Sequence, residues 1–245
     1  IAQAAREGIE GWREAGHAKA ALARQSLVAD HRTARLDAEL VLAPGPRLRF
    51  GPLSVAGESR VRPERIRAIA GLPVGEVYSP KALADAGARL RATGTFRSAR
   101  LVEAEQPAAD DTLPITAEIT DERRRRLGFG GEVATDDGVA LSAFWLHRNL
   151  LGGAERLRFD AAIAGIGGTS GGADYRLSTR FDRPATLRPD TGFFASAALA
   201  REDSDDYRED SLRLGAGLTR RFSDRREASA GVELWRSQVS DDLGE

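Results

Sequence analysis

The feature that most constrains the fold is an alternation of apolar and polar residues that recurs in seven segments between Leu127 and Arg236. Within each segment every second residue is largely apolar and those between are small or charged, as in a β-strand whose two faces meet different surroundings. The alternating positions are Leu127, Phe129, Gly131 and Val133; Val139, Leu141, Ala143 and Trp145; Leu157, Phe159, Ala161 and Ile163; Tyr175, Leu177, Thr179 and Phe181; Phe193 to Leu199; Leu212 to Leu218; and Ala228 to Leu234. Gly-, Asp- or Pro-rich turns separate them, so the pattern predicts an antiparallel sheet.

Two architectures fit such a sheet, a soluble sandwich and a membrane barrel, and periodicity alone does not separate them. With their flanks the segments reach the roughly 9 to 11 residues that a tilted strand needs to cross a bilayer. The connections also differ from side to side, as expected for long outer loops and short inner turns. The expected loops are residues 135–138, 165–173 and 201–210, and the expected turns are 151–154 and 223–226, with 184–191 a longer exception. This asymmetry favours a barrel wall.

Composition narrows the function classes. At 245 residues the chain can hold one or two domains. A net charge of -1 gives no case for a nucleic-acid partner, and no run of 18 apolar residues predicts a membrane helix. The absence of Cys fits an oxidising compartment. The chain opens on Ile1 inside an apparent helix, so any signal peptide is expected to lie upstream, outside this sequence.

Ahead of the alternating region the sequence predicts two related units. Residues 1–45 read as a helix that stops at Gly16, followed by a hairpin with its turn at 30–32. Residues 46–122 read as strand, helix, helix, strand, strand, with Pro63 and Pro80 each at the first position of a helix. The shorter unit matches the last three elements of the longer one, which indicates an internal repeat.

This order of modules resembles the outer-membrane assembly proteins that carry periplasmic POTRA domains ahead of a sixteen-stranded β-barrel, and within that family it is most similar to the TamA type. In the module, the residues that carry the resemblance are Phe50, Gly51, Pro52, Val55 and Gly57; Tyr78, Ser79 and Pro80; and Thr93 to Phe96. In the barrel they are Gly128 to Gly131; Thr135 to Gly138; and Trp145, His147, Arg148, Asn149, Leu150, Gly152 and Glu155.

The resemblance implies an α+β fold class with strand-helix-helix-strand-strand POTRA modules, followed by an antiparallel transmembrane β-barrel of which about the first seven strands lie in this chain. Residues 1–45 are then the C-terminal part of one POTRA domain, 46–122 a complete POTRA domain, and 123–245 the N-terminal part of the barrel. The expected location is the outer membrane, with the modules in the periplasm. The expected partners are unfolded outer-membrane clients, the lipid bilayer and an inner-membrane TamB-like protein.

Two strands are candidate sites. A Gly-rich first barrel strand should pair weakly with the closing strand, which predicts a lateral gate for autotransporter-like clients. The gate strand is Leu127, Gly128, Phe129, Gly130, Gly131, Glu132, Val133 and Ala134. An exposed module strand can accept an extended client by β-augmentation. That edge strand is Phe96, Arg97, Ser98, Ala99, Arg100, Leu101 and Val102.

Catalytic and cofactor chemistry is not predicted. The three histidines have no second ligand at metal spacing, the Gly-rich run 165–172 lacks a phosphate-binding ending, and the acidic run at 202–206 lacks a calcium-loop pattern and reads as a solvated loop. The run Arg123 to Arg126 is expected to reach headgroups at the membrane surface. We therefore expect no enzyme, metal or cofactor. The alternatives are a two-partner-secretion pore within the family and, from another class, a porin or lipid hydrolase.

Overall fold

The computed structural model describes residues 1–30, 32, 35–169, 171–223 and 225–241. Position 31 of the predicted hairpin turn, position 170 of the Gly-rich run and position 224 of the last predicted turn lie outside these residues. The elements are α1 (Ala2–Glu14), β1 (Ala21–Asp30), β2 (Arg35–Ala43), β3 (Arg49–Ala56), α2 (Pro63–Ala70), α3 (Pro80–Ala92), β4 (Phe96–Glu103), β5 (Thr112–Asp121), β6 (Arg125–Ala134), β7 (Gly138–Arg148), β8 (Arg156–Ile166), β9 (Asp174–Arg183), β10 (Thr191–Asp203), β11 (Tyr207–Ser223) and β12 (Arg226–Asp241). None of the described helices is long and apolar enough to cross a membrane.

The N-terminal segment is a helix followed by a two-stranded antiparallel hairpin, as the sequence predicts. Helix α1 ends at Glu14, and Gly16 follows with a φ of 102°, which a residue with a side chain rarely adopts. That these residues are the end of a further module remains a prediction.

The next elements follow the predicted order β3, α2, α3, β4, β5. Both prolines sit at the first helical position, where their missing N–H costs no hydrogen bond. The sheet order is β3-β5-β4, with β3 parallel to the central strand β5. Gly57 ends β3 with a φ of 96°, and a Cβ there would overlap the carbonyl oxygen of Ile119.

The chain divides into two compact units. The first comprises Ile1–Gly57, Ala70–Ala88 and Ala99–Ile119, and the second Glu58–Ile69, Arg89–Ser98 and Thr120–Glu245. Large buried side chains of the first unit are Leu48, Phe50, Tyr78, Leu113 and Ile115. In the second unit Ile66, Ile69, Leu90, Leu146 and Ala154 are buried, so α2 and the end of α3 belong with the long sheet.

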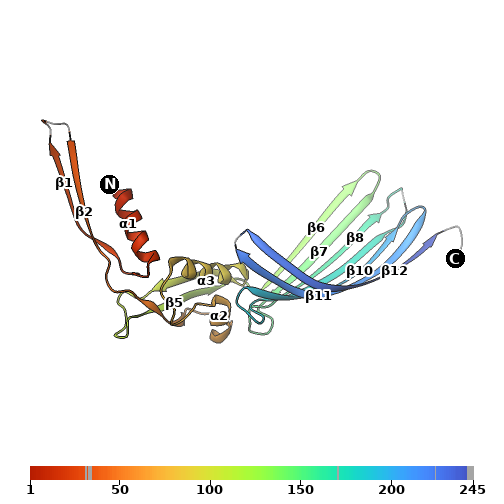
Figure 1. Ribbon diagram of the computed structural model, residues 1–245. Helices are drawn as coiled ribbons and strands as arrows, with labels where there is room; N and C mark the ends of the chain where they lie inside the picture. The colour runs from red at the N-terminus through yellow and green to blue at the C-terminus, as the bar shows by residue number, and fades with distance from the viewer. Residues whose placement is uncertain (31, 33–34, 170, 224, 242–245) are drawn as a thin grey trace. The chain divides into compact units, whose positions relative to one another are not determined.

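Seven antiparallel strands form one curved sheet in the order β12-β11-β10-β9-β8-β7-β6, which confirms the predicted number of strands (Figure 1). One predicted loop is wrong, because most of residues 201–210 is strand. The β10–β11 hairpin continues beyond the apolar positions, and its charges neutralise each other across the strands. Arg201 lies 2.7 Å from Asp210, and Arg208 lies 2.7 Å from Asp203.

The alternating apolar positions lie on one face and are largely exposed: Phe129 is 79% exposed, Val133 80% and Val232 76%. A single row of register partners across the sheet joins Leu127, Trp145, Phe159, Thr179, Ala197, Leu214 and Leu234. We call the end of the sheet that carries the β7–β8, β9–β10 and β11–β12 turns its inner end. Leu127 lies at the inner end of its apolar segment, whereas Leu234 lies at the opposite, outer end of its own segment. From β6 to β12 the apolar band therefore slides by six residues along the strands.

The slide gives the tilt of the band. Six residues span about 20 Å along a strand, and six strand spacings span about 29 Å across the sheet, so the band crosses the rows at roughly 35°. Transmembrane barrel strands tilt by about 35 to 45° to the membrane normal. A flat hydrocarbon layer laid over this face would thus cover all seven apolar segments only if the strands were tilted as in a barrel.

Candidate functional site

All eight residues of the predicted gate lie in β6, which is a terminal strand of the seven-stranded sheet. One edge of β6 pairs with β7 in an unbroken register from Arg125↔His147 to Ala134↔Gly138. Among the described residues no strand pairs with its other side. Leu127, Phe129 and Val133 face outward and are each more than half exposed. The strand therefore offers a row of main-chain donors and acceptors beside an apolar surface.

The glycines of β6 are not simply gaps. A Cβ on Gly128 would overlap the ring of Phe144, which projects from the paired position on β7. The ring takes the place of the missing side chain, as aromatic residues do beside glycines in edge strands. Arg158 lies over the same ring, with 4.4 Å from its Cζ to the centroid. Gly128 is thus packed on its β7 side, and any weakness of β6 belongs to its unpaired side.

The second candidate, Phe96 to Val102, lies in β4 at one edge of the three-stranded sheet. The opposite edge, β3, is already covered by main-chain hydrogen bonds. Phe50 donates to Glu76 O at 2.8 Å and accepts from Gly75 N at 2.8 Å, while Tyr78 N donates to Leu48 O at 2.9 Å. In the order of the described strands β4 has one strand neighbour, β5, so of the two edge strands it is the candidate for an added strand.

The β7–β8 turn contains residues that carry the family resemblance, among them Asn149, Gly152 and Glu155, but the sequence alone indicates no role for them. Glu155 is 2% exposed, and one of its carboxylate oxygens accepts Leu151 N at 3.1 Å and Gly153 N at 2.9 Å. Asn149 Oδ1 accepts Ala154 N at 3.0 Å. Asn149 and Ala154 both have a positive φ, of 58° and 64°. The side-chain bonds offset this strain and fix the shape of the turn.

This turn carries the contacts of the module segments in the second unit. Arg62 N, just before α2, donates to Gly152 O at 3.0 Å, and Thr95 Oγ1 donates to Ala154 O at 3.4 Å. Arg148 Nε donates to Gly94 O at 2.8 Å. The start of α2 and the turn between α3 and β4 are therefore held on one rigid loop of the sheet.

A second contact comes from α2. Arg65 donates to Pro184 O at 2.7 Å and to Ala185 O at 3.4 Å, both in the β9–β10 turn. Its Nε is buried and has no hydrogen-bond partner among the described residues. Burial of the guanidinium, together with the nearby Arg183 cation, lowers the pKa of Arg65. The predicted turn at 184–191 is thus part of this contact.

The predicted role of the Arg123 to Arg126 run is wrong for its last member. Arg126 lies on the face opposite Leu127, with its Cζ 5.8 Å from the Phe144 ring centroid. Strand alternation decides this, because residues one apart point to opposite faces. The carbonyls of Arg123 and Arg124 accept hydrogen bonds from Arg148, from Nη1 at 2.9 Å and from its backbone N at 2.7 Å.

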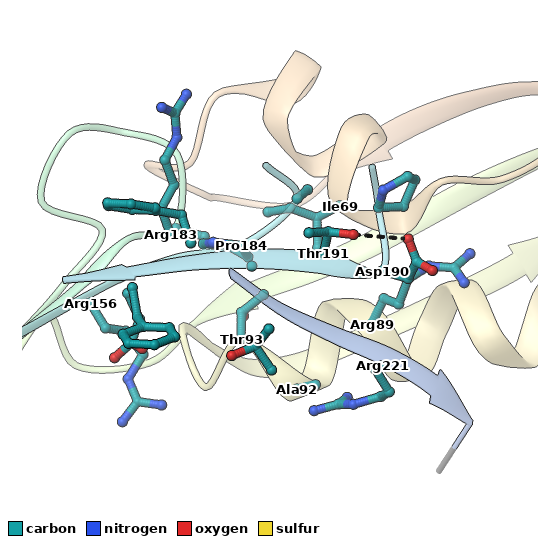
Figure 2. Close-up of a pocket in the computed structure, with 18 of the residues that line it drawn as sticks. Ile69, Arg89, Ala92, Thr93, Arg156, Arg183, Pro184, Asp190, Thr191 and Arg221 are labelled. Carbon is teal, nitrogen blue, oxygen red and sulfur yellow. Dashed lines mark hydrogen bonds between the residues drawn. The ribbon is translucent and has the colours of Figure 1, made fainter. Parts of the chain in front are cut away.

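The polar face ends in a cavity of about 500 Å³ that sequence reasoning missed. It lies within the second unit, between the ends of α2 and α3 and the inner ends of strands β8 to β12 (Figure 2). Six arginines line it against three acidic residues. They are Arg89, Arg156, Arg158, Arg180, Arg183 and Arg221, with Asp182, Asp190 and Glu227. Alternation alone could have indicated the arginines of β8 and β9 but not their convergence with the helices.

In the first unit, ion pairs and hydrogen bonds join the end of α1 and the segment after it to the module that follows. Arg13 donates to the hydroxyl of Tyr78 and lies 2.6 Å from Glu103, and Tyr78 Oη donates to Glu103 at 2.6 Å. Lys19 Nζ lies 3.5 Å from the same carboxylate. Burial and the hydrogen bond to Glu103 raise the pKa of Tyr78.

Comparison with solved structures gives the fold. BamA from Haemophilus ducreyi lacking POTRA domains 1–3 has a TM-score of 0.75 and is 14% identical, over 98% of this chain and 45% of its own. CdiB from Acinetobacter baumannii has a TM-score of 0.58 at 11% identity, over 93% of this chain and 43% of its own. CdiB from Escherichia coli has 0.58 at 13%, over 100% and 46%.

No protein-family model matches the chain. The chain spans a little less than half the length of the solved structures it matches. At these identities the likeness concerns the fold. The protein therefore shares with BamA and CdiB a module-and-sheet architecture in which the seven-stranded sheet corresponds to part of a β-barrel.

Proposed function

We propose that this chain is part of an outer-membrane protein that assembles or translocates other polypeptides, with its modules in the periplasm. The observation that carries the proposal is β6, a terminal strand at the end of an exposed apolar face, which pairs on one side only among the strands that the structure describes. The oblique apolar band supports a lipid surround, because only a tilted barrel wall aligns all seven segments with one flat layer.

The energetics favour strand addition at β6. In hydrocarbon every unpaired backbone N–H or C=O costs several kcal/mol, so an open edge at membrane depth must pair with another strand. The partner is either a closing strand of the same barrel or a strand of an incoming client. Because main-chain bonds do not depend on side chains, such an edge accepts clients of different sequence. No catalytic step is involved, so the proposed activity is non-enzymatic.

At finer detail we propose a TamA-type protein that assembles autotransporter-like clients with an inner-membrane TamB-like partner. In this scheme β4 first receives the extended client by β-augmentation, and β6 then receives it in the membrane. The sequence resemblance in the Gly-rich first strand and in the β7–β8 turn motif supports this assignment. So does the coverage of β3 by residues 75–78, which leaves β4 as the receiving edge.

Site-specific photo-crosslinking in cells tests both edges of the intact protein. A photoreactive residue replaces Phe129 or Val133 in β6, and the matched control replaces Leu177 in β9, which is equally lipid-facing but lies inside the sheet. For the module, Arg97 in β4 is compared with Glu118 in the central strand β5. We expect crosslinks to a newly made outer-membrane protein at the edge positions and not at the controls. Equal crosslinking at edge and control positions, or none at either, refutes the proposal.

A second candidate function is a polypeptide translocation pore. The charged polar face of the sheet favours it, because Arg158, Asp160, Arg180 and Asp182 line that face in neighbouring strands. A pore passes its cargo along this face, so a photoreactive residue at Ser178 would crosslink to the cargo while those in β6 would not. A steady, large conductance of the purified protein in planar bilayers would likewise favour the pore.

A further inference from the structure

We infer that the arginine-lined cavity at the inner end of the polar face binds an extended acidic polypeptide with carboxylates on alternate residues. The inference rests on the proposed function, because a site of this kind serves a protein that handles extended chains. It names a substrate preference that neither open edge supplies, since main-chain pairing at an edge does not read side chains.

The charge of the cavity points to an anion. Of its arginines on the polar face, Arg158 pairs with Asp160 at 2.5 Å, Arg180 with Asp182 at 2.9 Å and Arg221 with Glu227 at 3.6 Å. Arg156 differs, because in the part of the chain that the structure describes no carboxylate lies within 4 Å of it and its buried Nε has no hydrogen-bond partner. This Nε is not accessible to a ligand, but the terminal nitrogens of the same guanidinium, which lacks a carboxylate partner among the described residues, can take a carboxylate in a strong charge-assisted hydrogen bond.

The neighbours of Arg156 do not supply that carboxylate. Asp182 is directly opposite Arg156 in the β8–β9 register, but Arg180 occupies it. Gly94, against which the Arg156 guanidinium lies, has no side chain to offer. Figure 2 shows Arg156 and Arg221 on one side of the β10 ribbon and Arg183 on the other. Arg156 and Arg221 therefore both lie on the polar side of the sheet, where a ligand in the cavity would bind.

The geometry also fixes the spacing of the ligand's charges. Arg156 and Arg158 are two residues apart on one face of β8, so their backbone positions are about 6.6 Å apart, the same repeat as alternate residues of an extended peptide. Asp160 takes the Nε and Nη2 of Arg158, so a second ligand carboxylate would be bound through its Nη1. The guanidinium of Arg158 is stacked on Phe144, and that of Arg180 on Phe194 with 4.7 Å from Cζ to the centroid. Stacked guanidinium groups are oriented before the ligand arrives, which lowers the entropy cost of binding.

An extended polypeptide fits better than a lipid. The cavity opens on the polar face, where Arg156, Arg158, Arg180 and Asp182 alternate with the outward apolar positions. An acyl chain needs a continuous apolar wall, which the opposite face provides and this one does not. The apolar lining comes from the ends of α2 and α3, from Leu146 and Ala154, from the β9–β10 turn and from Phe193 and Phe194. It is interrupted by the arginines and carboxylates, which suits the side chains between two acidic residues better than a continuous acyl chain.

Fluorescence polarisation with the intact protein in detergent tests the inference. The probe is a labelled octapeptide of alternating Asp and Thr, and the reference is the same peptide with Asn for Asp. We expect Arg156→Gln to raise the dissociation constant of the acidic peptide at least tenfold and Arg156→Lys to raise it less. The matched control Arg176→Gln, on the same face of β9 but outside the cavity, should change it less than twofold. Protease resistance of each variant checks folding.

Three results overturn the inference: equal binding of the Asn peptide, equal loss in Arg176→Gln, or displacement of the probe by inorganic phosphate at the concentration at which the unlabelled peptide displaces it. The last result would indicate a general anion site. Because this assay needs no client assembly, its failure removes the cavity preference and leaves crosslinking at β6 unaffected. Loss of the β6 crosslinks removes the proposed function instead.

Discussion

Glu155 should contribute more to stability than any other single side chain of the β7–β8 turn. Its Oε2 accepts both Leu151 N and Gly153 N, and the residue is 2% exposed. Glu155→Ala leaves two donors without a partner, at about 1 to 3 kcal/mol each, so we expect a loss of about 2 to 6 kcal/mol. In Glu155→Gln one amide oxygen can replace Oε2 for both bonds, and the loss should be about 1 kcal/mol because only the charge is lost.

Two measurements on the intact protein in detergent check this expectation. Urea unfolding gives the free energy, and hydrogen exchange at Leu151 and Gly153 shows whether the turn opens locally. The control is Glu132→Ala, an exposed carboxylate on β6 that should change stability by less than about 0.5 kcal/mol. If Glu155→Ala matches this control in both measurements, the carboxylate does not hold the β7–β8 turn in shape, and the proposed role of Glu155 in this turn is wrong.

Three further predictions follow from single positions. Leu177→Arg places a charge near the middle of the apolar band and should lower the free energy of unfolding from vesicles by about 3 kcal/mol. Ser178→Arg, on the opposite face, should lower it by less than about 1 kcal/mol, and equal losses would contradict the assignment of faces. Gly128→Ala forces the Phe144 ring aside and should cost about 1 to 3 kcal/mol of unfolding free energy, so a neutral result would refute the packing of β6. The raised pKa of Tyr78 means that the folded protein holds the hydroxyl proton more tightly than the unfolded chain does. The contribution of this proton to stability is therefore complete below about pH 10 and decreases as the pH rises through the folded pKa. In an absorbance titration the Tyr78→Phe variant should lack the tyrosine component that ionises last, and an unchanged titration would exclude the shift.

The sequence predicts the strands well, because alternation is a local signal. Each of the seven segments lies within a strand of the sheet, and the helices begin at Pro63 and Pro80 as expected. The β10–β11 hairpin is longer than predicted because ion pairs such as Arg201–Asp210 form only once the two strands are aligned. A run of charges in one segment does not reveal its partner in the next.

The functional groups are harder to predict, because they come from segments distant in the sequence. Arg65 forms a hydrogen bond with the carbonyl of Pro184, 119 positions away in the sequence. Arg156 and the end of α3 are likewise distant in the sequence but line the same cavity. Nothing in the local pattern marks Glu155 as buried, although the glycines at 152 and 153 indicate a tight turn. The terminal position of β6 follows from the order of the antiparallel strands, whereas the edge position of β4 also depends on β3 pairing with β5, which element order does not decide.

The depth of spin labels in the intact protein in vesicles tests directly whether the seven-stranded sheet is a tilted barrel wall in lipid. The chain contains no Cys, so single cysteines at 127, 228 and 234 can each carry one nitroxide, with 178 as a control for the polar face. Relaxation by oxygen and by a water-soluble nickel complex reports depth. We predict that labels 127 and 228 lie at equal depth, whereas label 234, in the same row of register partners as 127, lies about 16 Å further across the bilayer. Equal depths at 127 and 234, or free access of the nickel complex to all three labels, would contradict a tilted barrel wall in lipid.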